Sequence, residues 1–164
     1  MKKGFTLIEL LLYLGLAAIM VLVIATFFGM MLGARVKNQV VAEIEQQGAQ
    51  VMHVITQTAR NAETITSPAQ GASAALLTLD VVTTANDPTV FDLSSGAMRI
   101  TEGVGSAVAL TNSRVTASTL NFQNLSRTGT PGTVRITFTL THVNPSRRNE
   151  YEYSKTFYGS ASLR

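Results

Sequence analysis

The distribution of apolar and polar residues divides the chain into three parts. Residues 10–34 carry no charged side chain and are almost entirely apolar. Residues 35–66 are amphipathic, with apolar side chains recurring at helical intervals of four and seven. From residue 67 onward, short runs of alternating apolar and polar residues are separated by glycine, proline and asparagine. This order predicts an α+β protein, in which a long N-terminal helix packs on a C-terminal antiparallel β-sheet.

The first two parts predict one continuous helix, because no proline interrupts the chain before Pro68. We expect it to run from about residue 5 to about residue 64, a length of about 90 Å. Its apolar stretch, residues 10–34, is about 37 Å long as a helix and can cross a hydrocarbon core of about 30 Å. The apolar stripe expected to cover the sheet is centred on Val36, Val40, Ile44, Val51 and Ile55, with Val41, Gly48, Ala59 and Ala62 filling in.

Among the glycines of this helix, those at residues 29, 33 and 48 are soft points. Glycine in a helix interior costs about 1 kcal/mol relative to alanine. Each one is compatible either with bending of the helix or with close contact to another element, and both readings stay open.

In the third part, the tripeptide Ser94-Ser95-Gly96 predicts a hairpin between strands at residues 90–93 and 97–101. Strict alternation predicts further strands at residues 134–141 and over much of 151–158. The other expected strands are residues 75–83, 107–111 and 120–125. Alternation of this kind gives a sheet with one packed face and one solvated face, and the amphipathic half of the helix can cover the packed face.

Composition restricts the chemistry. The chain of 164 residues has room for one domain of ordinary size, or for an anchor and a small domain. Its formal charge of +3 falls to about +1 without Lys2 and Lys3. This charge is weak support for nucleic-acid binding. The absence of cysteine excludes disulfides, thiolate metal sites and a cysteine nucleophile.

Neither histidine belongs to a recognisable metal or catalytic motif, so His53 and His142 are expected to be structural or surface residues. Asp80, Asp87 and Asp92 match the spacing of no compact calcium loop. We therefore expect no cofactor and no enzymatic activity.

Glu9 is the only charged residue between Lys3 and Arg35. A carboxylate within a membrane segment costs about 2.5–3.5 kcal/mol on insertion scales, so it needs a partner or a route to the headgroups. One alternative is that its side chain simply reaches the headgroup region. The other is a positive charge that the intact chain lacks, namely the α-amino group of Phe5 after cleavage behind Gly4.

Residues 2–10, Lys-Lys-Gly-Phe-Thr-Leu-Ile-Glu-Leu, resemble the leader and cleavage site of type IV prepilins and of the pseudopilins of type II secretion systems. The resemblance implies that prepilin peptidase cuts after Gly4 and N-methylates Phe5. It also implies that Glu9 pairs with the terminal amine of a neighbouring subunit during assembly. Many major pilins carry a proline within the apolar segment, and this chain departs from them there.

The resulting division is a leader at residues 1–4, a transmembrane and assembly helix at 5–34, an amphipathic helix at 35–66 and an antiparallel β-sheet domain at 67–164. The resemblance implies a structural subunit, of the minor kind, of a type IV pilus or a type II secretion pseudopilus. Its expected partners are the inner membrane, prepilin peptidase, other pilin or pseudopilin subunits and the assembly platform. Lys2 and Lys3 predict a cytoplasmic N-terminus and an extracytoplasmic C-terminal domain, which joins a periplasmic or cell-surface filament after assembly.

Two alternatives remain beside this interpretation. One is a minor pilin that binds a ligand, for DNA uptake or adhesion. Its candidate nucleic-acid surface consists of Arg147, Arg148, Tyr151, Tyr153 and Tyr158. The other is a β-domain held by a single membrane span that never polymerises, in which Glu9 would have no role in assembly.

Overall fold

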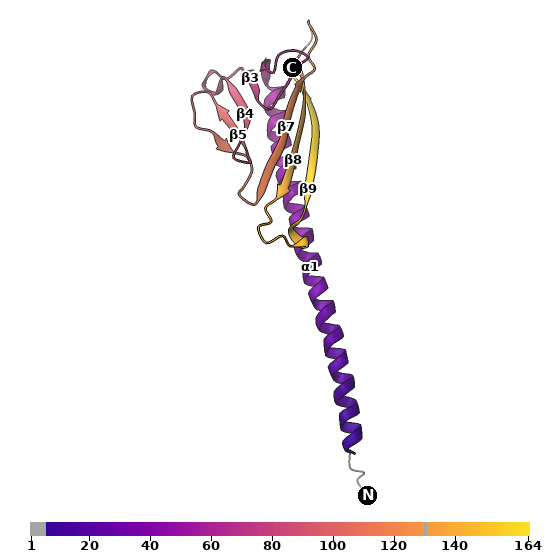
Figure 1. Ribbon diagram of the computed structural model, residues 1–164. Helices are drawn as coiled ribbons and strands as arrows, with labels where there is room; N and C mark the ends of the chain where they lie inside the picture. Colours follow the sequence, from indigo (N-terminus) through magenta and orange to yellow (C-terminus); the bar gives the residue numbers. More distant parts are fainter. Residues whose placement is uncertain (1–5, 130) are drawn as a thin grey trace. The chain divides into compact units, whose positions relative to one another are not determined.

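The computed structural model describes residues 6–129 and 131–164 and divides the chain into two compact units, Met1–Gln39 and Val40–Arg164. Helix α1, Leu7–Arg60, contributes to both units (Figure 1). In the second unit α1 packs on antiparallel β-structure, an α+β arrangement consistent with a pilin-like fold. The fold class expected from the sequence is therefore confirmed.

The second unit contains two antiparallel sheets where a single sheet was expected. The five-stranded sheet, called sheet A, has the order β1-β3-β4-β5-β6, and the four-stranded sheet, called sheet B, has the order β2-β7-β8-β9. The strands of sheet A are β1 (Ala62–Ser67), β3 (Leu77–Val81), β4 (Thr89–Ser94), β5 (Ala97–Glu102) and β6 (Val108–Ala109). Those of sheet B are β2 (Ser73–Ala74), β7 (Val115–Asn124), β8 (Thr133–His142) and β9 (Ser154–Ser162). Two short 3₁₀ helices, Thr84–Asn86 and Asn149–Tyr151, lie in the loops.

The predicted hairpin is confirmed. Strands β4 and β5 pair so that Ser94 lies opposite Ala97, and the two residues between them, Ser95 and Gly96, both have positive φ angles. Such a pair is typical of the two-residue turns that match the twist of antiparallel strands. The other predicted strands are present with shifted limits, most notably β7, which begins at Val115 rather than near residue 120.

The predicted C-terminal end of the helix was wrong. Helix α1 ends at Arg60, and the segment expected to form its last turn is strand β1, which pairs with β3. At the junction, the Asn61 N–H donates to the carbonyls of both Gln57 and Thr58, as at many helix ends. Residues 63–66 alternate and include three β-branched side chains, so a ladder with β3 suits them better than another helical turn.

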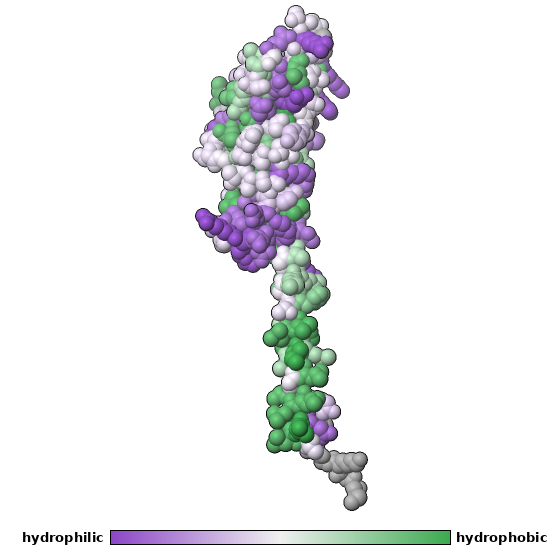
Figure 2. Space-filling view, turned by 45° about the vertical axis from the view of Figure 1, so that its right-hand side comes forward, coloured by the Kyte–Doolittle hydropathy of each residue, from purple (hydrophilic) through white to green (hydrophobic). Residues whose placement is uncertain are grey.

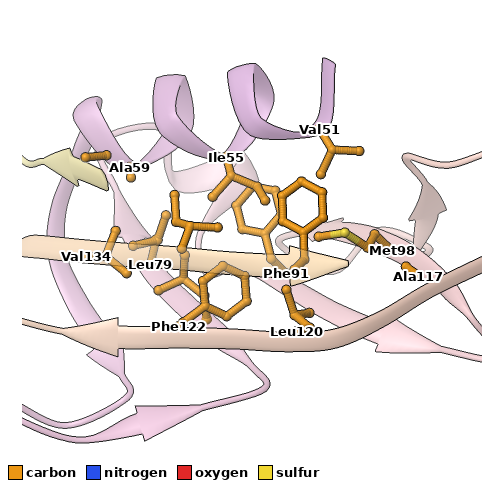
Figure 3. Packing of buried hydrophobic residues seen from close by; sticks show 14 of the residues in the cluster. Val51, Ile55, Ala59, Leu79, Phe91, Met98, Ala117, Leu120, Phe122 and Val134 are labelled. Atoms are coloured by element: carbon orange, nitrogen blue, oxygen red, sulfur yellow. The ribbon is translucent and has the colours of Figure 1, made fainter. Parts of the chain in front are cut away.

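The hydrophobic core of the second unit lies between α1 and the two sheets. Val51, Ile55 and Ala59 project from α1 toward side chains of the strands, among them Phe91 and Phe122, and all five are fully buried (Figure 3). The expected helical stripe is buried from Val40 to Ala59, whereas Val36 and Val41 are only partly buried. Ala62 is buried as well, but it contributes from strand β1 and not from the helix.

Candidate functional site

The first turn of α1 is closed by Thr6 and Glu9. The Thr6 N–H and hydroxyl donate to Glu9 Oε2 at 2.9 and 2.8 Å, and the Glu9 N–H points to Thr6 Oγ1 at 3.4 Å. This reciprocal arrangement is a capping box, which satisfies N–H groups that a helix start otherwise leaves unpaired. The Thr-x-x-Glu spacing was visible in the sequence, but its meaning for Glu9 was missed there.

The capping box engages only one oxygen of the Glu9 carboxylate. In the part of the chain that the structure describes, no hydrogen bond or ion pair reaches Glu9 Oε1. The expected processing site between Gly4 and Phe5, and the Phe5 amine expected to pair with Glu9, lie outside the described residues. The Glu9 carboxylate is thus oriented by the first turn of its own helix.

Behind Glu9, the first unit presents an uncovered apolar surface. Every side chain from residue 6 to residue 32 is exposed, including Leu14, Ile24 and Phe27 at 64%, 66% and 68% (Figure 2). The hydroxyl of Thr26 donates to the carbonyls of Leu22 and Val23, so it adds little polarity to this surface. Among the described residues α1 is the one helix long and apolar enough to cross a membrane.

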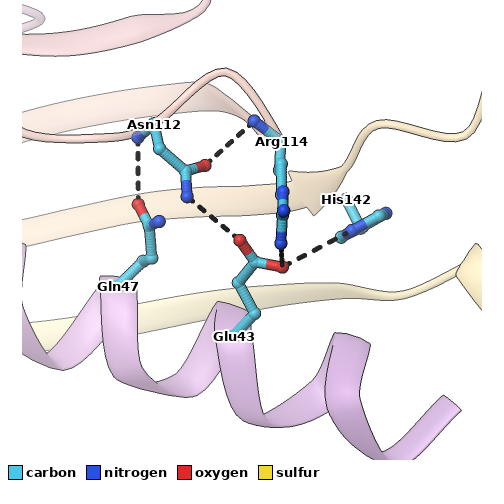
Figure 4. A network of polar contacts seen from close by, with 5 residues as sticks. All are labelled: Glu43, Gln47, Asn112, Arg114 and His142. Atoms are coloured by element: carbon cyan, nitrogen blue, oxygen red, sulfur yellow. Dashed lines mark hydrogen bonds and ion pairs between the residues drawn. The ribbon is translucent and has the colours of Figure 1, made fainter. Parts of the chain in front are cut away.

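In the second unit, a polar network joins α1 to the β-structure (Figure 4). The Glu43 carboxylate accepts a hydrogen bond from Asn112 Nδ2 at 3.0 Å and lies 3.7 Å from the Arg114 guanidinium. One turn farther along α1, Gln47 Oε1 accepts the backbone N–H of Asn112 at 3.1 Å. These contacts connect the helix to the loop that precedes β7, and nothing in the local sequence pattern indicated them.

His142, at the end of β8, also faces this network. Its Nε2 lies 3.8 Å from Glu43 Oε2, its side chain is 9% exposed, and its ring stacks on Tyr151 with centroids 5.7 Å apart. Within the described residues, its buried Nδ1 has no hydrogen-bond partner, and no group of three or more metal-binding side chains is present. His53 is exposed on α1 and far along the helix from Glu43. The geometry thus gives His142 a packing position beside an ion pair.

The residues expected to form a nucleic-acid surface are not brought together as one patch. Arg148 bonds to Glu150 at 3.1 Å, which raises the pKa of Arg148, and it lies over the ring of Tyr151. Tyr153 instead points toward Glu45 on α1, with its hydroxyl 3.5 Å from the carboxylate. Tyr158 lies on β9 with 75% of its surface exposed.

Asp80, Asp87 and Asp92, which match no calcium-loop spacing, each have a different partner. Asp92 forms a two-pronged ion pair with Arg99 across β4 and β5, at 2.6 and 2.8 Å, and this bonding raises the pKa of Arg99. Asp80 lies 3.5 Å from the hydroxyl of Thr64. Asp87 accepts the N–H of residue 81 at 3.4 Å.

Comparison of the chain with protein-family models, curated proteins and solved structures found no match. Two features of the described residues therefore bear on function. The first is the uncovered apolar helix that begins with a capped carboxylate, and the second is the folded β-domain held to that helix by the Glu43 network.

Proposed function

We propose that this chain is a minor structural subunit of a type IV pilus or of a type II secretion pseudopilus, assembled through its N-terminal helix. The observation that carries the proposal is the exposed apolar surface from Leu7 to Leu32, broken by a single charged side chain, Glu9, in its first turn. A helix that served only as an anchor would gain nothing from a carboxylate at that depth.

The apolar surface suits two environments. In the inner membrane lipid covers it, and in a filament the same surface packs against copies of itself. Lipid tails are about as apolar as leucine. Moving the helix from the membrane into a filament therefore exchanges apolar contacts with lipid for apolar contacts with protein, at little cost in hydrophobic free energy. The specificity of the assembled state must then come from polar contacts, and Glu9 is the charged group placed to make one.

Processing would supply the partner of Glu9. Cleavage by prepilin peptidase after Gly4 creates a cationic amine on Phe5, which the same enzyme N-methylates. Among the described residues only Oε2 of Glu9 is engaged, by Thr6, and in this proposal Oε1 accepts the amine of a neighbouring subunit. Two opposite charges attract most strongly in a medium of low dielectric constant, and a pair with good geometry there would set the register between subunits.

Localisation follows from the same features. Lys2 and Lys3 favour a cytoplasmic N-terminus, a single membrane span and an extracytoplasmic domain built from Val40–Arg164. The partners in this role are prepilin peptidase, the assembly platform and other pilin or pseudopilin subunits. The role requires no cofactor and no catalytic group.

The first test is the intact mass and N-terminal fragmentation of the protein purified from its native membrane. We expect a chain that begins at Phe5 and carries one added methyl group on its terminal nitrogen. A chain that still begins at Met1, in cells with an active prepilin peptidase, would contradict the proposal and leave a membrane-anchored β-domain.

A second test separates the charge of Glu9 from its capping role. Glu9→Gln keeps an oxygen that can accept the Thr6 hydrogen bonds but removes the charge, whereas Glu9→Leu removes both. We expect both variants to remain in the membrane and to be lost from sheared filaments, while the control Met20→Leu is incorporated normally. Normal incorporation of Glu9→Leu would favour the anchored domain that never polymerises.

A further inference from the structure

The outer face of sheet B is rich in hydroxyl side chains. On β8 the side chains of Val134, Ile136, Phe138 and Leu140 are buried, and the residues between them face away from the core. The outward positions of β7, β8 and β9 carry hydroxyl or amide groups, apart from Arg135 and Tyr158. None of these three strands contains an aspartate or a glutamate. The face is therefore broad, polar and nearly uncharged.

Its hydroxyl groups are held in place by one another. Across β8 and β9, the hydroxyls of Thr139 and Thr156 lie 2.9 Å apart, and those of Thr141 and Ser154 are also 2.9 Å apart. A hydroxyl has one donor and two acceptor sites, so each paired group keeps hydrogen-bonding capacity toward a ligand. The backbone register thus fixes rows of oriented hydroxyls before any ligand arrives.

Tyr158 stands at the middle of β9 and is the aromatic group of this face. Its side chain is 75% exposed, and within the described residues it makes no hydrogen bond and no ring contact. The register places it in one row with Thr137 and Asn121. In the next row, Arg135 bonds to Gln123 at 3.4 Å. An open aromatic ring therefore lies beside amide, hydroxyl and guanidinium groups.

We propose that this face binds an extended, uncharged polysaccharide. Sugar hydroxyls need partners that both donate and accept hydrogen bonds, and hydroxyl and amide side chains do both. The flat ring of Tyr158 offers an apolar surface for the C–H face of a sugar ring. With about 3.4 Å per residue, β8 spans about 34 Å, which suits an extended chain better than a compact ligand.

Other classes of ligand fit this face less well. Single-stranded nucleic acid requires several cations along its backbone, and the face supplies only Arg135. The energetic centres of protein interfaces are poor in serine and threonine, which make up most of this surface. An uncharged glycan is the class that matches both the hydroxyl groups and the near absence of charge.

The test is co-sedimentation of the full chain with powdered chitin and cellulose, in a detergent whose head group contains no sugar. We expect the wild-type chain to sediment with at least one of the two glycans and not with an inert silica powder. Tyr158→Ala should weaken binding roughly two- to tenfold, the range expected for the loss of an aromatic contact. Tyr158→Phe keeps the ring and should bind like the wild type.

The matched control is Thr101→Ala, which removes a hydroxyl from sheet A and should leave sedimentation unchanged. Failure of the wild type to bind either glycan would overturn the inference, as would full binding by Tyr158→Ala. Retention on single-stranded DNA that depends on Tyr158, without glycan binding, would also overturn it and favour the nucleic-acid alternative. The inference does not depend on filament assembly, because the assay uses the isolated chain.

Discussion

Gly48 of α1 lies directly against the ring of Phe157 in β9, so closely that a Cβ atom at residue 48 would overlap the ring. Phe157 is itself stacked on Phe138 with centroids 5.3 Å apart, which limits its movement. One turn along, the relationship is reversed, since Gly159 of β9 lies against the side chain of Met52. Two glycines thus permit the close approach of helix and strand. For Gly48, the structure decides in favour of close contact, one of the two readings that the sequence left open.

Replacement of Gly48 tests this contact. We expect Gly48→Ala to lower the free energy of unfolding by about 1–2 kcal/mol, because overpacking outweighs the gain in helix propensity. The control is Gly29→Ala on the same helix, where nothing lies within 4 Å of the added Cβ, and no loss is expected. Urea unfolding in micelles, followed by tyrosine fluorescence, measures both. Equal unfolding free energies of the two variants would show that the Phe157 ring moves aside without a free-energy cost.

Gly96, in the turn of the β4–β5 hairpin, and Gly71, in the loop before β2, form a second matched pair of glycines. Gly96 and Gly71 both have a φ angle of +77°, but only at Gly96 would a Cβ meet another side chain, Thr116, at 2.8 Å. Gly71→Ala should therefore cost about 1 kcal/mol from backbone strain alone, and Gly96→Ala should cost about 1–2 kcal/mol more. The difference between their unfolding free energies measures the steric part. Equal losses of unfolding free energy in the two variants would mean that backbone strain accounts for the whole effect of Gly96→Ala.

The Glu43 network should stabilise the second unit mainly through Asn112. Glu43→Ala removes the acceptor of Asn112 Nδ2 and is expected to cost about 1–3 kcal/mol. Glu43→Gln keeps that acceptor and should cost less. Arg114→Ala should cost less than about 1 kcal/mol, because the guanidinium side chain is 73% exposed. A loss from Arg114→Ala as large as that from Glu43→Ala would assign the main role to the ion pair instead.

The pair formed by Lys155 and Glu45 predicts sensitivity to alkaline pH. Lys155 Nζ lies 2.5 and 2.6 Å from the two carboxylate oxygens of Glu45, and this hydrogen bonding raises the pKa of Lys155 above its ordinary value of 10.5. The folded state therefore holds this proton more tightly than the unfolded state does. Stabilisation by the pair is complete below pH 10.5 and is lost as the pH rises through the folded-state pKa.

Unfolding free energies on both sides of pH 10.5 check this expectation. The wild type should lose more stability than Lys155→Met as the pH rises. Both chains contain the same tyrosines, so the difference between them isolates Lys155. Parallel declines in the two proteins would mean that the pair contributes nothing to the pH dependence.

The features that the sequence predicted correctly depend on residues close together in the chain. The buried stripe through Ile44, Val51 and Ile55 follows from helical spacing, and the turn at Ser95 and Gly96 follows from local backbone preference. The capping box of Thr6 and Glu9 was not predicted, although it is equally local, since its two members are three residues apart. Each could be read from a short window, because the physical cause acts within that window.

The features that the sequence did not predict join residues far apart in the chain. Glu43 meets Asn112 and His142, and β1 leaves the helical pattern to pair with β3. The division into two sheets and the scattering of Tyr151, Tyr153 and Tyr158 belong here too.

By itself the sequence determined where apolar and polar side chains lie along each element, because helix and strand periods are local. Only the tertiary structure decided where α1 ends, how the strands are ordered and which polar groups meet. Those outcomes depend on the free energy of packing and of strand pairing between distant segments, set against the entropy of closing the loops between them.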